Sequence, residues 1–277
     1  AVSKSNGSSI IQIGNNVGGS QVYQSSNGTV DVLTTFIAIS TTTYITARNF
    51  NSSTPALVDN ISVRLADPDR SVNGKGLAVH GSITKAPVAT GADVVGYSGF
   101  SASNYLQQPY NSDLDFGTGD FCVMGWSKTT RAIHLMFSKN NGTAYSIIFG
   151  GYSSTSFWFG TKDGSGTSSI ISTSAHASGA WMHYCGVRKS GVMYLYENGV
   201  LIGTSTATAR NVTQANDILA IGYDASGSGG IAGDTLYSLL RISATAPTAD
   251  QIAKIYEDEK VLFQENAKAT LTGSSDA

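Results

Sequence analysis

Residues 114–126, LDFGTGDFCVMGW, decide the fold that this sequence predicts. The stretch opens with a turn, FGTGD, and continues into residues 121–126, where apolar side chains occupy odd and even positions alike. Because successive side chains of a strand point to opposite faces, a strand with this pattern is buried on both sides. We therefore expect the central strand of a sandwich, with a sheet or covering loops above and below it.

The composition favours strands and turns over helices. Of the 277 residues, 41% are hydrophobic, which is enough for a sizeable core, whereas only 13% are charged, about half the usual share. Ser, Thr, Asn and Gly take the place of the missing charges; Thr suits a pleated sheet, and Gly and Asn suit turns. Low charge with many hydroxyl groups is common in extracellular and virion-surface proteins.

Charge and hydropathy argue against two classes of partner. The formal net charge is −2 and no run of Lys or Arg occurs, so nucleic-acid binding has little electrostatic support. No apolar run approaches the roughly 20 residues that span a bilayer, so membrane insertion is not expected. The chain begins AVSKSNGSS, without an initiator Met or a visible signal peptide, and we expect a processed protein or a fragment of a longer one.

Turn signals divide the chain into four parts. Residues 1–65 form a small β-rich segment with a hairpin turn at Asn27 and Gly28, residues 66–76 a linker, residues 77–260 a β-sandwich, and residues 261–277 a C-terminal tail. The strands expected in the first part are 9–13, 19–24, 30–39, 42–47 and 57–65. Besides the central strand, those expected in the sandwich are 77–83, 94–100, 104–106, 133–139, 145–149, 156–161, 169–172, 181–189, 192–197, 200–204, 218–222 and 235–242.

One helix is expected, over residues 245–260. Thr248 is a good N-cap, and Gln251 stands three residues later as its reciprocal partner in a capping box. Ile252 and Ile255 fall on one face at helical spacing, together with neighbouring apolar residues. These signals predict a helix with one apolar face.

The two cysteines, Cys122 and Cys185, both lie in apolar strand contexts. We expect two buried thiols, and a disulfide between neighbouring strands is the alternative. Neither cysteine has a partner at ligand spacing, so a metal pair is not indicated.

Three ordered motifs carry a family resemblance over residues 77–260. They are residues 104–126, residues 181–203, and residues 233–242 followed by PTADQI at 247–252. Together they resemble the laminin-G-like, concanavalin A-like lectin domains. The wording SNYLQQPYNSDLDFGTGDFCVMGW at 103–126 is similar to copies carried on bacteriophage tail fibres and other virion appendages. Residues 1–65, with VDNISV at 58–63, resemble the C-terminal half of a carbohydrate-binding-module jelly roll.

The resemblance implies an all-β fold: a two-sheet antiparallel jelly-roll sandwich with one short C-terminal helix, preceded by the small β-rich segment. One sheet is expected to be concave, with loops at its rim. Members of the family include glycan binders, protein-binding modules, hydrolases and structural spacers, so the fold alone does not fix the function.

No catalytic residue is predicted. Retaining glycosidases of this sandwich need two carboxylates about 5 Å apart, often within Glu-x-Asp-x-x-Glu, and the sequence has no such motif. Glu197 precedes a hairpin turn, while Glu257, Glu259 and Glu265 lie on the expected helix and tail. The four histidines are scattered, and no serine sits on a strand–turn–helix elbow. We therefore expect a protein that is not an enzyme.

The resemblance implies a possible calcium site at the rim of the sandwich, built from loop carboxylates. Asp113, Asp115 and Asp120 flank the loop before the central strand and are the candidate ligands, because calcium prefers oxygen atoms on loops. The alternative is that these residues form turns by bonding their own backbone. No other cofactor is expected.

Glycan binding needs an exposed aromatic ring beside amide and carboxylate groups. Three loop regions offer this combination, and packing in the core is the alternative role for each aromatic residue. The candidates are Tyr105, Tyr110 and Asn111 in the first region, Tyr152 and Trp158 in the second, and Tyr223 with Asp224 in the third.

These observations predict a non-enzymatic appendage protein of a virion, of the phage tail or fibre type, located on the particle or otherwise extracellular. Its expected partners are a host-surface glycan or receptor, other virion subunits and further copies of itself, as a trimer in a fibre. One alternative is a structural spacer or decoration domain that mediates subunit contacts. A cryptic glycan hydrolase is the other.

Overall fold

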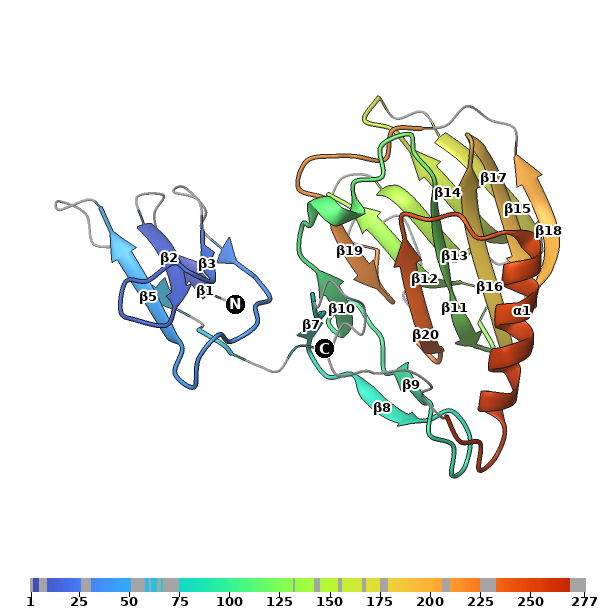
Figure 1. Cartoon of the computed structure of the whole chain (residues 1–277), viewed down its shortest axis with the longest axis horizontal. Helices are drawn as coiled ribbons and strands as arrows, with labels where there is room; N and C mark the ends of the chain where they lie inside the picture. The colour runs from blue at the N-terminus through green and yellow to red at the C-terminus, as the bar shows by residue number, and fades with distance from the viewer. Residues whose placement is uncertain are drawn as a thin grey trace. The chain divides into compact units, whose positions relative to one another are not determined.

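The computed structural model describes residues 2–4, 9–25, 31–50, 58–59, 61–63, 66, 75–131, 133–141, 145–153, 156–165, 168–174, 179–205, 210–224 and 233–269. The chain divides into two compact units, Ala1–Val79 and His80–Ala277 (Figure 1). In the part of the chain that the structure describes, no helix is both long and apolar enough to cross a membrane.

The first unit holds two small antiparallel sheets. One sheet has the strand order β4 (Asp31–Val32), β1 (Val2–Lys4), β6 (Val58–Asp59). The other has the order β3 (Tyr23–Gln24), β2 (Ser9–Gly14), β5 (Tyr44–Asn49). Ile11 and Val32 form a small core between them. The strand expected at 30–39 is wrong beyond Val32, because residues 33–39 form no strand and Ile37 and Ile39 are exposed. The turn expected at Asn27 and Gly28 lies outside the described residues.

From Ala78 onward the chain forms a sandwich of two antiparallel sheets, as expected, and each sheet has seven strands. Sheet A has the order β15 (Ser168–Ser174), β14 (Ser156–Lys162), β13 (Tyr145–Ser153), β12 (His134–Asn140), β19 (Ile218–Ile221), β10 (Tyr105–Gln108), β7 (Ala78–His80). Sheet B has the order β18 (Val200–Ser205), β17 (Val192–Glu197), β16 (Trp181–Lys189), β11 (Phe121–Lys128), β20 (Leu236–Ser243), β9 (Val95–Ser98), β8 (Thr84–Pro87).

Aromatic side chains fill the space between the two sheets. The ring centroids of Phe157 and Tyr184 are 4.0 Å apart, and those of Phe121 and Phe159 are 5.9 Å apart. The sheets approach closely at Gly186, where an added Cβ atom would lie 2.8 Å from the ring of Phe159. A glycine is therefore required there for the aromatic layer to fit.

The central strand is confirmed as β11, which pairs with β16 on one side and β20 on the other. All six residues from Phe121 to Trp126 are buried. The cover on the outer side is a helix rather than a sheet or a loop: Cys122, Met124 and Cys185 cluster there with Ile252 of α1 (Ala249–Lys260). Both cysteines are buried and free, so the expected thiols are found without a disulfide.

The helix α1 forms the predicted capping box and lies against sheet B (Figure 1). The side chain of Thr248 accepts a hydrogen bond from the backbone of Gln251, whose own side chain accepts one from Thr248. Farther along, the indole Nε1 of Trp126 donates to Glu259 Oε2 at 2.7 Å. Glu259 also forms an ion pair with Arg241 of β20, so the helix is attached to the sheet by a buried carboxylate.

His183 of β16 lies beneath this helix and makes folding sensitive to acid. It is fully buried, and neither ring nitrogen has a hydrogen-bond partner among the described residues. Burial lowers the pKa of His183 to about 4, and the nearby Arg241 guanidinium contributes to the shift. In the unfolded chain the pKa is about 6.5, so the unfolded state binds a proton that the folded state excludes between these two values.

Above pH 6.5 we expect His183 to have no effect on the free energy of unfolding. As the pH drops towards 4, the free energy of unfolding is expected to fall by up to about 3 kcal/mol. Denaturant unfolding of the wild type and of His183→Leu across this window measures the effect. Carboxylates also titrate in this window, so we compare the two proteins by the slope of the unfolding free energy plotted against pH. Equal slopes for the wild type and His183→Leu would show that His183 does not cause the pH dependence.

Candidate binding site

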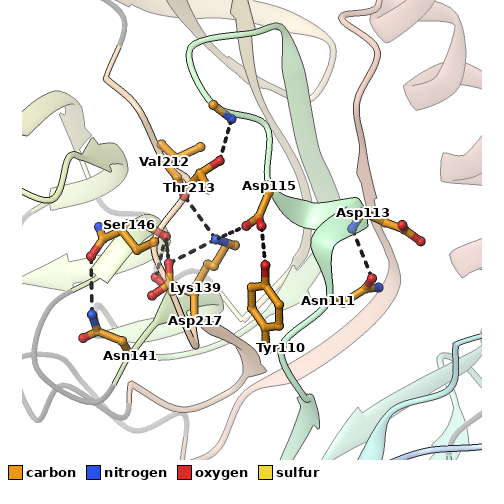
Figure 2. A network of polar contacts seen from close by, with 12 residues as sticks. Tyr110, Asn111, Asp113, Asp115, Lys139, Asn141, Ser146, Val212, Thr213 and Asp217 are labelled. Atoms are coloured by element: carbon orange, nitrogen blue, oxygen red, sulfur yellow. Dashed lines mark hydrogen bonds and ion pairs between the residues drawn. The ribbon is translucent and has the colours of Figure 1, made fainter.

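Two loops meet at one end of sheet A and form what we call the rim, residues 109–120 and 210–217 with the end of β12 (Figure 2). The first loop follows β10 and the second leads into β19, and these two strands are paired. The backbone of Val212 donates to the carbonyl of Gly117 at 3.0 Å, and that of Gly117 to Thr213 Oγ1 at 3.1 Å. The two loops are thus held together by direct hydrogen bonds.

Tyr110 is the exposed aromatic residue of the rim. The residue is 50% exposed, and its hydroxyl donates a hydrogen bond to Asp115 Oδ2 at 2.8 Å. This hydrogen bond raises the pKa of Tyr110, as does the negative charge of Asp115. The ring is therefore accessible to solvent but fixed at its polar end.

Tyr110 is followed by a short 3-10 helix, η1 (Ser112–Leu114), which contains Asp113. Asn111 is the N-cap, and its Oδ1 accepts a hydrogen bond from the backbone of Asp113 at 3.1 Å. The side chain of Asp113 is exposed in the first turn. An amide and a carboxylate therefore lie in the same loop as Tyr110, although Figure 2 shows the Tyr110 ring pointing toward Asp115 and not toward these two side chains.

A buried lysine supports the rim from below. Lys139, near the end of β12, is only 1% exposed, and its Nζ donates to Asp217 Oδ2 at 3.0 Å and to the Val212 carbonyl at 3.1 Å. It also contacts Asp115 Oδ1 at 3.4 Å. Tyr110, Asp115, Lys139 and Asp217 thus form one continuous polar chain from the surface to the core.

A buried arginine fastens the other side of both loops. The guanidinium of Arg188 donates to three backbone carbonyls, those of Gly117 at 2.8 Å, Gly119 at 2.7 Å and Arg210 at 2.6 Å. It lies 4.6 Å from the ring centroid of Phe121. Burial lowers the pKa of Arg188 to about 10, so it remains charged at neutral pH.

The structure brings Tyr105, Tyr223 and Asp224 together, but at the other end of β10 and β19. The rings of Tyr105 and Tyr223 stack with centroids 4.4 Å apart, and His80 stacks on the far side of Tyr105 at 4.1 Å. Asp224 is buried and accepts a hydrogen bond from Ser138 at 3.4 Å. Both tyrosines are half-buried, so this stack offers less accessible surface than Tyr110.

Tyr152 and Trp158 belong to neighbouring strands and lie apart from the rim. Tyr152 is part of β13, and Trp158 is half-buried on β14. Since Phe157 and Phe159 point into the core, Trp158 points to the outer face of sheet A. Three strands separate β14 from β10, so these residues and the Tyr105 stack do not form one site.

The carboxylates considered as calcium ligands have other partners. Asp115 contacts Lys139 and Tyr110, and Asp120 accepts a hydrogen bond from the backbone of Ser190 at 2.7 Å. Among the described residues, no group of three or more His, Cys, Asp or Glu side chains is placed to hold a metal ion. Asp115 and Asp120 are therefore already engaged by other groups of the protein.

Comparisons with known proteins agree on the fold. A family model described as the concanavalin A-like lectin/glucanases superfamily matches residues 100–253. Similar solved structures are the binding domain of paraclostridial mosquitocidal protein 1 (16% identity, TM-score 0.55, covering 69% of this chain and 49% of that chain), the binding domain of botulinum neurotoxin serotype G (12%, 0.54, 69% and 48%) and the receptor binding domain of botulinum neurotoxin C/D mosaic serotype (11%, 0.55, 69% and 48%).

This chain spans about half the length of those solved structures. At such identities the likeness shows the fold alone. A comparison with curated proteins found no match.

Proposed function

Because this chain belongs to the concanavalin A-like lectin/glucanase superfamily, we propose that it is a non-enzymatic module that binds a host-surface glycan or receptor at the rim. The observation that carries the proposal is Tyr110, an exposed ring held in place by Asp115 and followed in the same loop by Asn111 and Asp113. The similar solved structures are described as binding or receptor binding domains, which supports the same class of function.

The chemistry of the rim suits a sugar. The apolar face of a pyranose packs on an aromatic ring, while its hydroxyl groups need amide and carboxylate partners. A ring that is already fixed loses little conformational entropy when the ligand binds, so less of the binding free energy is offset by the ordering of the side chain. The chain of hydrogen bonds from Tyr110 to Lys139 supplies that preorganisation.

The carboxylates of the rim are poorly suited to glycoside hydrolysis. Asp115 and Asp217 both contact the ammonium group of Lys139, and the side chain of Asp217 is completely buried. A general acid and a nucleophile must both reach the glycosidic bond. The sandwich strands carry one glutamate, Glu197, at the end of β17.

We further propose a virion setting for this module, on a phage tail or fibre-type appendage. Support comes from the sequence of residues 103–126, which resembles domains carried on phage appendages, and from the low charge of the chain. A structural role in subunit contacts is the second candidate, favoured by the edge strand β18, where Val200, Leu201 and Ile202 are all exposed. A stable trimer in light scattering, with no ligand bound by the chain, would favour this second role.

Replacing Tyr110 by alanine is expected to weaken glycan binding by about tenfold or more, since a stacking aromatic residue commonly dominates such contacts. The measurement is a glycan array with the full chain, with and without calcium, followed by titration of each hit. Tyr110→Phe keeps the ring and loses the bond to Asp115, so a smaller loss is expected. Tyr44→Ala, at an exposed tyrosine of the first unit, is the matched control.

Three results would count against the proposal. The first is that the chain binds no glycan and no host-surface protein in either buffer. The second is that Tyr110→Ala and Tyr44→Ala bind equally well. The third is the release of reducing sugar from a bound glycan, which would favour a hydrolase instead.

A further inference from the structure

The oxygen atoms around the ammonium group of Lys139 are of the kinds that coordinate a hard cation such as calcium. Its Nζ contacts two carboxylate oxygens and a backbone carbonyl, contributed by Asp115, Asp217 and Val212 from the two rim loops. Calcium sites in proteins are built from the same kinds of oxygen atoms, brought together from separate loops. Three acceptors also match the three N–H bonds of an ammonium group.

The charges of this cluster require a cation at its centre. The side chains of Lys139 and Asp217 are 1% and 0% exposed, and that of Asp115 is 13% exposed. Asp217 Oδ2 accepts a second hydrogen bond from Ser146 at 2.5 Å, while Asp217 Oδ1 is buried with no partner among the described residues. Without the ammonium group, two carboxylates would remain together in a region poor in water, which is strongly unfavourable.

We propose that the ammonium group of Lys139 is the resident cation of the rim and does the work that a bound calcium ion would otherwise do. It draws the loop of Asp115 and the loop of Val212 and Asp217 to one point. Asp115 in turn holds Tyr110. The rim is therefore organised without a metal ion, and ligand binding is independent of calcium. The statement about ligand binding rests on the proposed function, whereas the statement about the cation does not.

Thermal unfolding of the full chain in EDTA and in about 5 mM calcium tests the proposal. The melting temperature of the wild type is expected to be the same in both buffers. Lys139→Ala is expected to melt roughly 10 °C lower in EDTA, because it leaves the two carboxylates unpaired. At least half of that loss is expected to return with calcium, or with propylammonium, which supplies the atoms that the substitution removes.

Two further variants act as controls. Lys139→Met removes the charge but keeps most of the volume, so a similar loss is expected with no recovery in propylammonium. Lys189→Met removes an exposed lysine at the end of β16 and is expected to match the wild type in every buffer. A lower melting temperature for Lys139→Met than for Lys189→Met separates the buried charge from the general effect of losing a lysine.

Several results would overturn the proposal. One is a rise of several degrees in the wild-type melting temperature with calcium, and another is a Lys139→Ala chain as stable as Lys189→Met. If Lys139→Ala does not fold, the double variant Lys139→Met/Asp217→Asn decides. It is expected to be more stable than Lys139→Met, because the buried carboxylate of Asp217, which has lost its cation, is also removed. A double variant no more stable than Lys139→Met would contradict the resident cation. None of these measurements needs a glycan, so a failed glycan array leaves this inference standing.

Discussion

Replacing Arg188 by methionine is expected to lower the free energy of unfolding by about 3–5 kcal/mol. Methionine keeps an apolar contact over Phe121, but it removes the guanidinium donor from the carbonyls of Gly117, Gly119 and Arg210, of which Gly117 keeps its bond from the Val212 backbone. Hydrogen bonds from a charged donor are among the strongest in proteins, and here one side chain makes three of them. Urea unfolding of the full chain measures the loss.

The matched control is Arg131→Met. Arg131 is 54% exposed, and its ion pair with Asp234 spans 3.6 Å, so a change below about 0.5 kcal/mol is expected. Arg188→Lys can reach fewer of the three carbonyls and should fall between the wild type and Arg188→Met. If Arg188→Met unfolded like Arg131→Met, the guanidinium would not be the fastening point of the two rim loops.

The second large effect is expected for Trp126→Ala, which should lower the free energy of unfolding by about 3–5 kcal/mol and loosen α1. The indole is 2% exposed, and its ring stacks on Phe263 with centroids 4.3 Å apart. Its loss opens a cavity under the helix and removes the donor that Glu259 uses. Hydrogen exchange should show faster exchange of the α1 amides before the strands of sheet B are affected.

Trp158→Ala removes a tryptophan of the other sheet, away from α1, and controls for the loss of an indole. Its helix amides are expected to exchange as in the wild type. Glu259→Gln separates the two contributions, since it keeps the volume of the helix surface and removes the charge that pairs with Arg241. Equal exchange of α1 in the Trp126 and Trp158 variants would mean that another contact attaches the helix.

The sandwich could be predicted where a run of apolar residues is bounded by turn residues such as Ser190 and Gly191. The expected strands 181–189 and 192–197 match β16 and β17 residue for residue. The sequence does not predict β8, because all four of its residues are exposed at the edge of a sheet and no alternation marks them. The expected strand at 104–106 ends too early, because Gln107 and Gln108 are polar by type yet buried in β10.

The site could be predicted in part. Residue type put Tyr110 and Asn111 in one loop, and the structure has this loop at the rim, but neither Lys139 nor Arg188 was recognisable as the support beneath it. Lys139 contacts Val212, which is 73 residues away in the chain, and Arg188 contacts Gly117, which is 71 residues away. A local sequence pattern cannot indicate contacts between residues so far apart in the chain. The one available signal is a charge at the end of an otherwise apolar strand pattern, HLMFSKN for Lys139 and WMHYCGVRK for Arg188.

The position of β11 between β16 and β20 has a consequence for how the chain folds as it is made. Residues 121–128 leave the ribosome long before residues 181–189 and 236–243, which form their two neighbours. Pairing over such separations is slow, because a long loop must close before any contact is gained. The buried central strand of sheet B therefore stays open on both edges for much of synthesis, the period in which a nascent sandwich is most prone to aggregate.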